Sequence, residues 1–305
     1  MIRTVLGDID KSELGKTLAH EHFIVDLDRV RHDGFSFIFD IDEVVPEIRK
    51  AMDQGIQAAF EVTTNDMGRD VRKLKQISEI TGLKIVCSTG FYLSAYHPEW
   101  FDKADKEEIA GIFINDLTNG IDDTGIKAGL IAEIASSPKS FEGHEKKVLE
   151  AAAIAAEKTG FAVSTHTGRF TAIETIKTLL NGGVDPDKII IGHQDLIDDP
   201  EYHLSLLKYG VNIAFDTCGK VAYCPDEIRA ANARKIVEAG YEDHLVLSND
   251  ISRHTYFTSF GKQGYLAVMD SVVPFMRKEG LSEDIINKFL IDNPARIVNN
   301  ERIGG

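Results

Sequence analysis

The stretch LAHEHF at positions 18–23 places two histidines two residues apart, with a glutamate between them. On an extended strand alternate side chains share a face, so His20 and His22 project together while Glu21 points the other way. Two neighbouring imidazoles are either a polar coincidence or a pair of metal ligands. Other residues of the chain are needed to distinguish these two interpretations.

Further side chains that suit a metal ion stand at the ends of later apolar runs, and they are Glu133, His166, His193 and Asp250. Each has a simpler explanation: a histidine bonded to a carbonyl group, a glutamate on the surface of an irregular strand, or an aspartate that caps a helix. Six such residues at the ends of successive strands favour a metal centre. They exceed what one ion with an open position needs, and they suit two divalent cations bridged by a carboxylate.

The apolar runs predict eight strands, at 17–25, 58–63, 84–89, 129–134, 161–166, 189–193, 211–217 and 245–250. Amphipathic patterns that end in glycine predict helices between them, at 44–55, 69–82, 144–160 and 225–240. Eight strands that alternate with helices predict parallel pairing and a single-domain (β/α)8 TIM barrel over residues 1–305.

An open doubly wound sheet also fits this alternation, but no GxGxxG fingerprint follows the first strand. Residues 92–128 are long for a crossover, so we expect them to add loop and helix at the barrel mouth. Residues 283–298 predict a final helix on the outside of the barrel. In a barrel of this kind the active site lies at the C-terminal ends of the strands, where the polar residues stand.

The composition limits which class of protein this can be and which partners it can bind. The chain is 43% hydrophobic and 27% charged, as in globular proteins, and its net charge of -15 disfavours nucleic acid and anionic membranes. The first residues of the sequence lack the apolar core of a signal peptide, no later stretch approaches a membrane span, and Cys87, Cys218 and Cys224 are too few for a disulfide framework. We therefore expect a cytoplasmic protein that binds a small-molecule substrate, with a homodimer left open.

The order HxH, His, His, Asp resembles the amidohydrolase superfamily, and the chain is similar to its phosphotriesterase family. The segments GKTLAHEH, GRDVRKLKQISEITGLKIVCSTGFY, STHTG, IIIGHQD and NPARI follow that family's pattern along nearly the whole chain. Most members carry a carboxylated lysine on the fourth strand, but here Ala132 stands near that place and Glu133 beside it. This resembles the branch called phosphotriesterase homology protein, in which a glutamate bridges the metals. The offset of one residue requires a local irregularity in the strand.

The resemblance implies two divalent ions per chain, with zinc preferred and manganese, cobalt, iron and nickel open. His20, His22 and Asp250 would hold one ion, His166 and His193 the other, and Glu133 would bridge them. Ions that share a water lower its pKa enough to supply hydroxide near neutral pH. Asp250 would accept the proton through a free carboxylate oxygen and pass it to the leaving group. Tyr92 would hydrogen-bond the electrophilic oxygen, unless it is only a rim aromatic that packs against a loop.

The resemblance implies hydrolysis of esters or lactones, with phosphoester or phosphotriester hydrolysis as the alternative. A binding protein on a hydrolase barrel and a deaminase with one metal also stay open. Lys220 and Arg253 follow the last two strands, where a point charge and a planar fork suit a phosphate or carboxylate group of the substrate. Alternatively, each cation pairs with a neighbouring acid such as Asp216 or Asp226.

Overall fold

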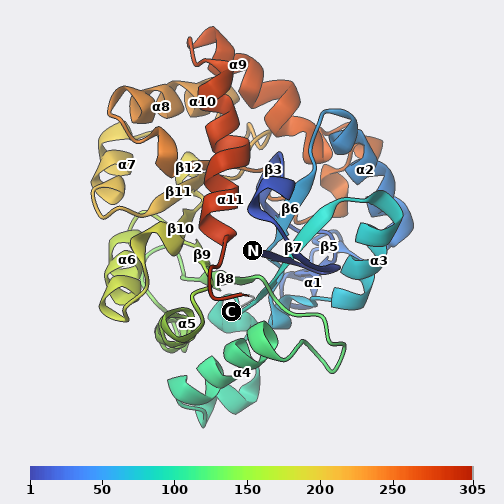
Figure 1. Ribbon diagram of the computed structural model, residues 1–305, viewed down its shortest axis with the longest axis vertical. Helices are drawn as coiled ribbons and strands as arrows, with labels where there is room; N and C mark the ends of the chain where they lie inside the picture. The colour runs from blue at the N-terminus through green and yellow to red at the C-terminus, as the bar shows by residue number, and fades with distance from the viewer. Residues whose placement is uncertain (304–305) are drawn as a thin grey trace.

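Eight parallel strands form one sheet at the centre of the computed structural model, which describes residues 1–303 (Figure 1). Neighbours in the chain are neighbours in the sheet: β3 (Thr17–Glu21), β6 (Ala58–Glu61), β7 (Lys84–Thr89), β8 (Leu130–Ala135), β9 (Val163–His166), β10 (Ile189–Gly192), β11 (Asn212–Phe215) and β12 (Leu245–Leu247). The two end strands, β12 and β3, lie against each other, so the sheet curls into a nearly closed barrel. The predicted (β/α)8 architecture and its eight strands are confirmed, and the last two positions of the predicted domain lie outside the described residues.

Helices surround the sheet on its outer side (Figure 1). They are α2 (Ile41–Asp53), α3 (Val71–Thr81), α4 (Lys106–Thr118), α5 (Glu145–Thr159), α6 (Ala172–Asn181), α7 (Pro200–Leu207), α8 (Asp226–Glu238), α9 (Val273–Lys278) and α10 (Glu283–Asn287). The short α1 (Asp28–Arg31) lies in the loop after β3. The last helix, α11 (Asn293–Val298), crosses the face of the barrel shown in Figure 1 and packs Ala295, Ile297 and Val298 against the side chains that fill its interior, so the expectation that this segment lies on the outside is wrong for α11. The predicted stop signals act as expected in α3 and α5, where Gly82 and Gly160 follow the helix in the left-handed conformation that glycine adopts without strain. The final predicted helix is present as α10, a π-helical turn and α11.

One expectation about the connection between β7 and β8 is wrong. Its helix α4 packs against α5, so it belongs to the outer ring and is not part of the barrel mouth. A crossover between parallel strands needs such a helix to cover the sheet. Only the short 3-10 turns at Ser94–Tyr96 and Glu99–Asp102 follow the C-terminal end of β7 directly.

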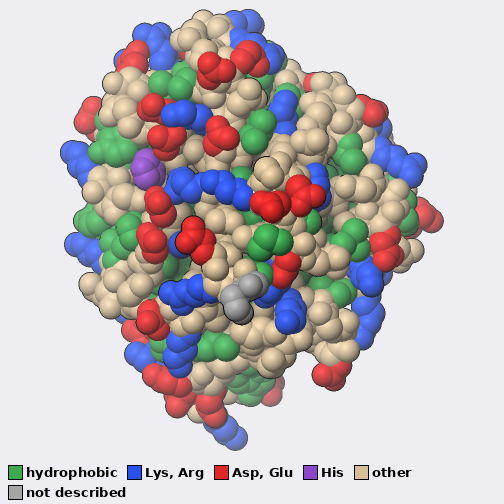
Figure 2. All heavy atoms as spheres, in the orientation of Figure 1, with side chains coloured by type: hydrophobic (Ala, Val, Ile, Leu, Met, Phe, Trp, Pro, Cys, Tyr) green, Lys and Arg blue, Asp and Glu red, His purple; other side chains and the backbone are tan. Residues whose placement is uncertain are grey.

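Two antiparallel hairpins accompany the barrel. The hairpin of β1 (Ile2–Thr4) and β2 (Gly7–Ile9) begins the chain, and β4 (Val25–Asp26) pairs with β5 (Phe37–Ile38) in the loop after β3. The N-terminus lies beside the segment that follows α11, where the Met1 ammonium donates a 2.8 Å hydrogen bond to Asn299. Basic and acidic side chains are interspersed over this face (Figure 2). Within residues 1–303, no helix has the length and apolarity needed to cross a membrane.

Candidate active site

Two of the strands that carry predicted metal ligands contain one extra residue relative to their neighbours. In β8, Ile131 pairs with Val163 and Ile134 with Thr165, so three steps along β8 match two along β9. Side chains alternate along a strand, and an extra residue therefore turns the next side chain back to the same face. This is the local irregularity that the sequence required, and it brings Glu133 to the barrel interior beside Ala132.

The strand β3 has a second irregularity of the same kind. Its pairing with β6 shifts between Leu18 and Glu21, again by one residue. Ala19 packs with the side chains inside the barrel, and His20 follows it there in place of alternating to the outer side. As a result His20 and His22 both face the centre of the barrel mouth, as the spacing HxH predicted.

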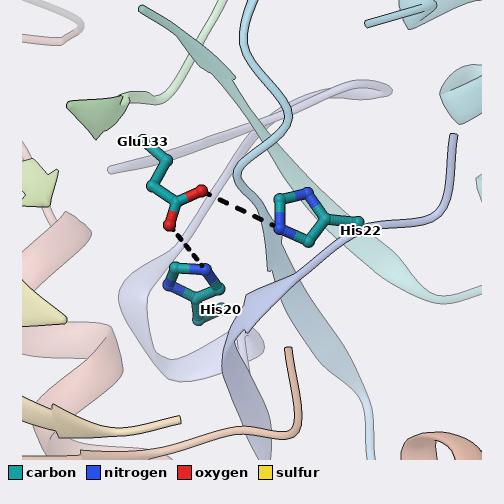
Figure 3. Close-up of side chains that lie close together, drawn as sticks. All are labelled: His20, His22 and Glu133. Atoms are coloured by element: carbon teal, nitrogen blue, oxygen red, sulfur yellow. Dashed lines mark ion pairs between the residues drawn. The ribbon is translucent and has the colours of Figure 1, made fainter. Parts of the chain in front are cut away.

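The carboxylate of Glu133 lies among four histidines. Its Oε1 is 3.4 Å from His20 Nε2, and its Oε2 is 3.9 Å from His22 Nε2 (Figure 3). On the other side, Oε1 is 2.7 Å from His166 Nδ1 and 3.1 Å from His193 Nε2. One carboxylate therefore reaches both pairs of histidines, which is the geometry that a bridging ligand needs.

Asp250 lies on the side of the HxH pair. Its Oδ1 is 3.3 Å from His22 Nε2 and 3.8 Å from His20 Nε2. Its Oδ2 accepts a hydrogen bond from the Lys220 ammonium, so the expectation of a free carboxylate oxygen is wrong. Lys220 therefore pairs with an acid, as the alternative to substrate binding held, but the acid is Asp250 and neither Asp216 nor Asp226, because the loops after β11 and β12 bring Lys220 to Asp250.

The donor set fits divalent cations. The sets His20, His22, Glu133 and Glu133, His166, His193 each have ligand atoms within 4.8 Å of one another, and Glu133 belongs to both. Both ring nitrogens of His20 are buried, and neither makes a hydrogen bond within residues 1–303; their neighbours are carboxylate oxygens, with Asp216 Oδ2 3.2 Å from Nδ1 and Glu133 Oε1 3.4 Å from Nε2. Buried, unpartnered nitrogen next to carboxylate oxygen is a ligand environment suited to zinc and similar metals. These buried groups can hold a metal site.

A second set of side chains orients the histidines from behind. Asp216 accepts a 2.8 Å hydrogen bond from His193 Nδ1 with one oxygen, and its other oxygen lies 3.2 Å from His20 Nδ1. On the far side, His22 Nδ1 lies 2.8 Å from the Thr63 hydroxyl, which itself donates to Glu61. Such partners fix the ring orientation, so the remaining nitrogen of each imidazole faces the centre.

The protonation states follow from burial and neighbouring charge. Burial raises the pKa of the Glu133 carboxyl, but His166 and His20 outweigh it and hold that pKa well below its usual range. Burial also raises the pKa of Asp250, but the nearby positive charges, above all the Lys220 ammonium, outweigh burial and lower that pKa below its usual value. Burial and the Glu133 charge raise the pKa of the Tyr92 phenol well above its usual value, so Tyr92 remains a hydrogen-bond donor.

Tyr92 packs in the core and also reaches the histidine cluster. It is buried against Tyr96, with ring centroids 5.3 Å apart, and its backbone N–H donates a 3.0 Å hydrogen bond to Asp66. At the same time its hydroxyl lies 3.4 Å from His166 Nδ1. The packing of the ring therefore directs the phenol toward the histidine cluster.

Glu21, the residue between the two histidines, has a structural role that the sequence did not reveal. It is fully buried on the opposite side of β3, and it accepts hydrogen bonds from Ser248 Oγ at 2.7 Å and from the backbone N–H groups of Asn249 and Ile251 at 2.8 and 3.1 Å. Those residues flank Asp250. Glu21 therefore holds the loop that presents Asp250; its one sequence signal was a charged residue within an apolar strand.

A buried arginine that the sequence analysis did not single out anchors the loop after β11. Arg229 donates to Asp195 at 2.6 Å, to Asp226 at 2.9 Å and to the Thr217 hydroxyl at 2.9 Å. Its side chain is fully buried. The segment it holds begins next to Asp216, which orients two histidines, and ends at Lys220, which contacts Asp250. This network is missed from sequence because its members come from three separate segments.

Arg253 follows β12 and stacks on aromatic rings. Its guanidinium carbon lies 5.1 Å from the centroid of Phe35 and 5.7 Å from that of Tyr256. The Lys220 ammonium lies 5.3 Å from the centroid of the same Tyr256 ring. Neither Asp216 nor Asp226 pairs with Arg253, since His193 and Arg229 engage these acids.

Comparison with known proteins agrees with the fold and with the cluster of histidines and carboxylates described above. The sequence model of the Phosphotriesterase family matches residues 1–298. The phosphotriesterase homology protein of Escherichia coli is 33% identical over 92% of this chain and 97% of its own length. Its crystal structure with phosphate in the active site superimposes with a TM-score of 0.91, at 32% identity over 95% of this chain and all of the other.

Two further relatives differ in the activity their names describe. A lactonase from Listeria monocytogenes has a TM-score of 0.92, at 29% identity over 98% of both chains. An aryldialkylphosphatase from Saccharolobus solfataricus is 29% identical over 94% of this chain and 96% of its own. The family match spans both the barrel and the residues gathered at its mouth, and the chain belongs to the phosphotriesterase family.

Proposed function

We propose that this protein is a hydrolase of esters or lactones that works with two divalent metal ions, zinc being the preferred metal. The observation that carries the proposal is the position of Glu133, whose carboxylate lies within 4 Å of a nitrogen of all four histidines. One carboxylate between two pairs of imidazoles suits two ions better than one. This also argues against a deaminase with one metal, which has little use for a bridging ligand.

In this proposal the histidines and carboxylates divide into two groups. His20, His22 and Asp250 would hold one ion, His166 and His193 would hold the other, and Glu133 would serve both. When bound, the ions supply an activated water and polarise the oxygen of the bond to be broken. The remaining steps fall to side chains of this protein.

Asp250 and Tyr92 are the two groups placed to act on the reacting atoms. Asp250 is ionised, because Lys220 lowers its pKa, so it can accept the proton of the attacking water at Oδ1 and return it to the leaving group. Tyr92 is protonated, so its hydroxyl can donate a hydrogen bond to the electrophilic oxygen.

We propose further that the substrate is a small molecule that carries negative charge. Arg253 stacks on Phe35 and Tyr256 beside the cluster, a setting that leaves its planar fork available for a phosphate or carboxylate group. The E. coli relative, whose structure holds phosphate in its active site, supports this reading. The cavity at the barrel mouth, about 140 Å³, suits a small molecule and not a nucleic acid or a membrane.

The lactonase relative favours lactones, and the aryldialkylphosphatase relative keeps phosphoester hydrolysis as the second candidate. Both reactions would use the same cluster. The loops that follow the strands select between substrates in such barrels.

The test is metal content combined with one conservative substitution. The purified protein should contain about two metal ions per chain, and Glu133→Gln should lower that number and reduce hydrolysis by about 100-fold or more, because an amide cannot bridge two cations. Glu142→Gln, an exposed change in the loop after the same strand, is the matched control and should behave like the unmodified protein. One ion per chain, or full activity without metal, would refute the proposal.

A further inference from the structure

Three basic side chains line the cavity in front of the histidine cluster. The cavity is lined by His166, His193 and Asp250 of the cluster and by the basic residues Arg31, Lys220 and Arg253. The chain as a whole carries a net charge of -15. A concentration of three cations at one small opening therefore runs against the overall charge of the molecule, and it would attract and hold an anion.

The three cations are not equivalent. Lys220 is neutralised by Asp250. Within residues 1–303 no carboxylate comes within 4.0 Å of the guanidinium of Arg31 or Arg253, whereas arginines such as Arg169 and Arg229 have an acidic partner. Two unpaired guanidinium groups at one cavity supply two positive charges that the protein itself leaves uncompensated.

The acids closest to Arg31 in the chain are occupied by the turn that carries it. Asp28 accepts a 2.6 Å hydrogen bond from the backbone N–H of Gly34. Asp33 accepts hydrogen bonds from the backbone of Phe35 and Ser36 at 3.1 and 2.9 Å. Their carboxylates stabilise the turn after α1, and Arg31 keeps its charge for another partner.

The same turn also supports Arg253. Ser36 Oγ accepts a 3.5 Å hydrogen bond from Arg31 Nη1, and Phe35 stacks against the Arg253 guanidinium at 5.1 Å. The Arg31 side chain is exposed overall; the loss of water where it borders the cavity lowers its pKa, but Tyr92, Tyr96 and Asp250 outweigh this effect and raise it. One short segment of the loop after β3 thus positions both unpaired guanidinium groups at the edge of the cavity.

We propose that Arg31 is a specificity residue that binds the substrate together with Arg253, so that the site selects substrates with two negative charges over those with one. The inference rests on the proposed hydrolase function and deepens it. The two charges can reside on one phosphate group or on two carboxylates, and both meet the same pair of guanidinium groups.

The experiment compares kcat/KM for one lactone scaffold that carries no charge, one carboxylate, two carboxylates or one phosphate. In the unmodified protein the doubly charged lactones should be the better substrates. Arg31→Gln should lower kcat/KM for these by about 10- to 100-fold, the loss expected for one charge-assisted contact, and by less than about threefold for the neutral lactone. The carboxylate and phosphate members show which arrangement of charge is preferred.

Arg29→Gln, an exposed change on the same short helix, is the matched control and should leave all four values unchanged. Arg31 is itself exposed, so its substitution should not impair folding, and equal melting temperatures check this. An equal loss for all four lactones would mean that Arg31 only supports the loop. An unchanged value for the doubly charged lactones would mean that it makes no contact. Either result overturns the inference.

A binding measurement separates failure of this inference from failure of the proposed function. If the unmodified protein hydrolyses none of the lactones, the proposed activity is wrong, but calorimetric titration with inorganic phosphate at pH 8 still tests Arg31. Arg31→Gln should then raise the Kd for phosphate by about tenfold or more, while Arg29→Gln leaves it unchanged. Equal Kd values for the unmodified protein and Arg31→Gln would be enough to refute the role of Arg31 in anion binding, whatever the result of the activity assays.

Discussion

Replacement of Lys220 by methionine tests the ion pair that the structure places beside the candidate active site. The side chains of Lys220 and Asp250 are only 9% and 15% exposed, so their charges are largely removed from water. Loss of one partner from a buried pair costs about 3–5 kcal/mol, because the other charge remains buried. His22 and His20 lie within 4 Å of Asp250 and offset part of this. We therefore expect the free energy of unfolding to fall by about 3 kcal/mol in protein stripped of metal, the lower end of that range.

Urea unfolding in the presence and absence of metal measures this loss. Bound metal next to Asp250 supplies positive charge, so the loss should shrink when metal is present. In kinetic assays kcat should fall for neutral and anionic substrates alike, because Asp250 is the proton acceptor in our proposal. Lys262→Met, an exposed change on the following loop, serves as the control. The reasoning is refuted if unfolding is unchanged with and without metal and only KM for anionic substrates rises, since Lys220 would then act on the substrate alone.

Three further predictions concern single groups. Asp250→Asn should lower kcat by about 100-fold or more while KM changes little, because an amide cannot accept the proton; a change in KM alone would exclude the proton role. Arg229→Met should lower the free energy of unfolding by about 3–5 kcal/mol, since Asp195 and Asp226 lose their buried partner, whereas a loss below about 1 kcal/mol would contradict the anchoring role. Burial raises the pKa of Asp66 from 3.8 to about 6, so its contribution to stability is complete below pH 3.8 and disappears as the pH rises through 6. Those 2.2 units correspond to about 3 kcal/mol, and Asp66→Asn should abolish this dependence in urea unfolding between pH 3 and 8; parallel curves would show that Asp66 is not its source.

The barrel architecture and the cluster of polar residues at its mouth could be predicted because both depend on short patterns within the sequence. Apolar runs of five to nine residues predicted the strands, and polar residues of the right type in or at the end of several of these runs predicted the positions of the histidines and of Asp250. The irregularity at Glu133 could also be anticipated, because a ligand displaced by one residue must be turned back toward the barrel interior. The similar shift in β3 left no such sign in the sequence, since His20 and His22 keep their spacing across it.

The contacts that could not be predicted connect loops far apart in the chain. Lys220 reaches Asp250 across 30 residues, and Arg229 reaches Asp195 across 34. The partner of a charged side chain depends on which loops meet, and neither spacing nor composition records this. The role of Arg31 could not be predicted for the same reason. The residue lies in a short helix whose sequence shows no recognisable pattern, and only the folded structure places it at the cavity.

Glu21 has a consequence for the order in which the protein is made. Its carboxylate joins the first barrel strand to the loop after the last one, across 228 residues of chain. A ribosome delivers His20 and His22 first, whereas Asn249, which donates to Glu21, and the adjacent Asp250 follow only after more than 220 further residues have been added. The first strand therefore cannot make this contact until the loop after the last strand has been synthesised. A partly synthesised chain cannot present the complete set of metal ligands. Long-range closure of this kind is slow, so metal loading should follow synthesis of the loop that carries Asp250.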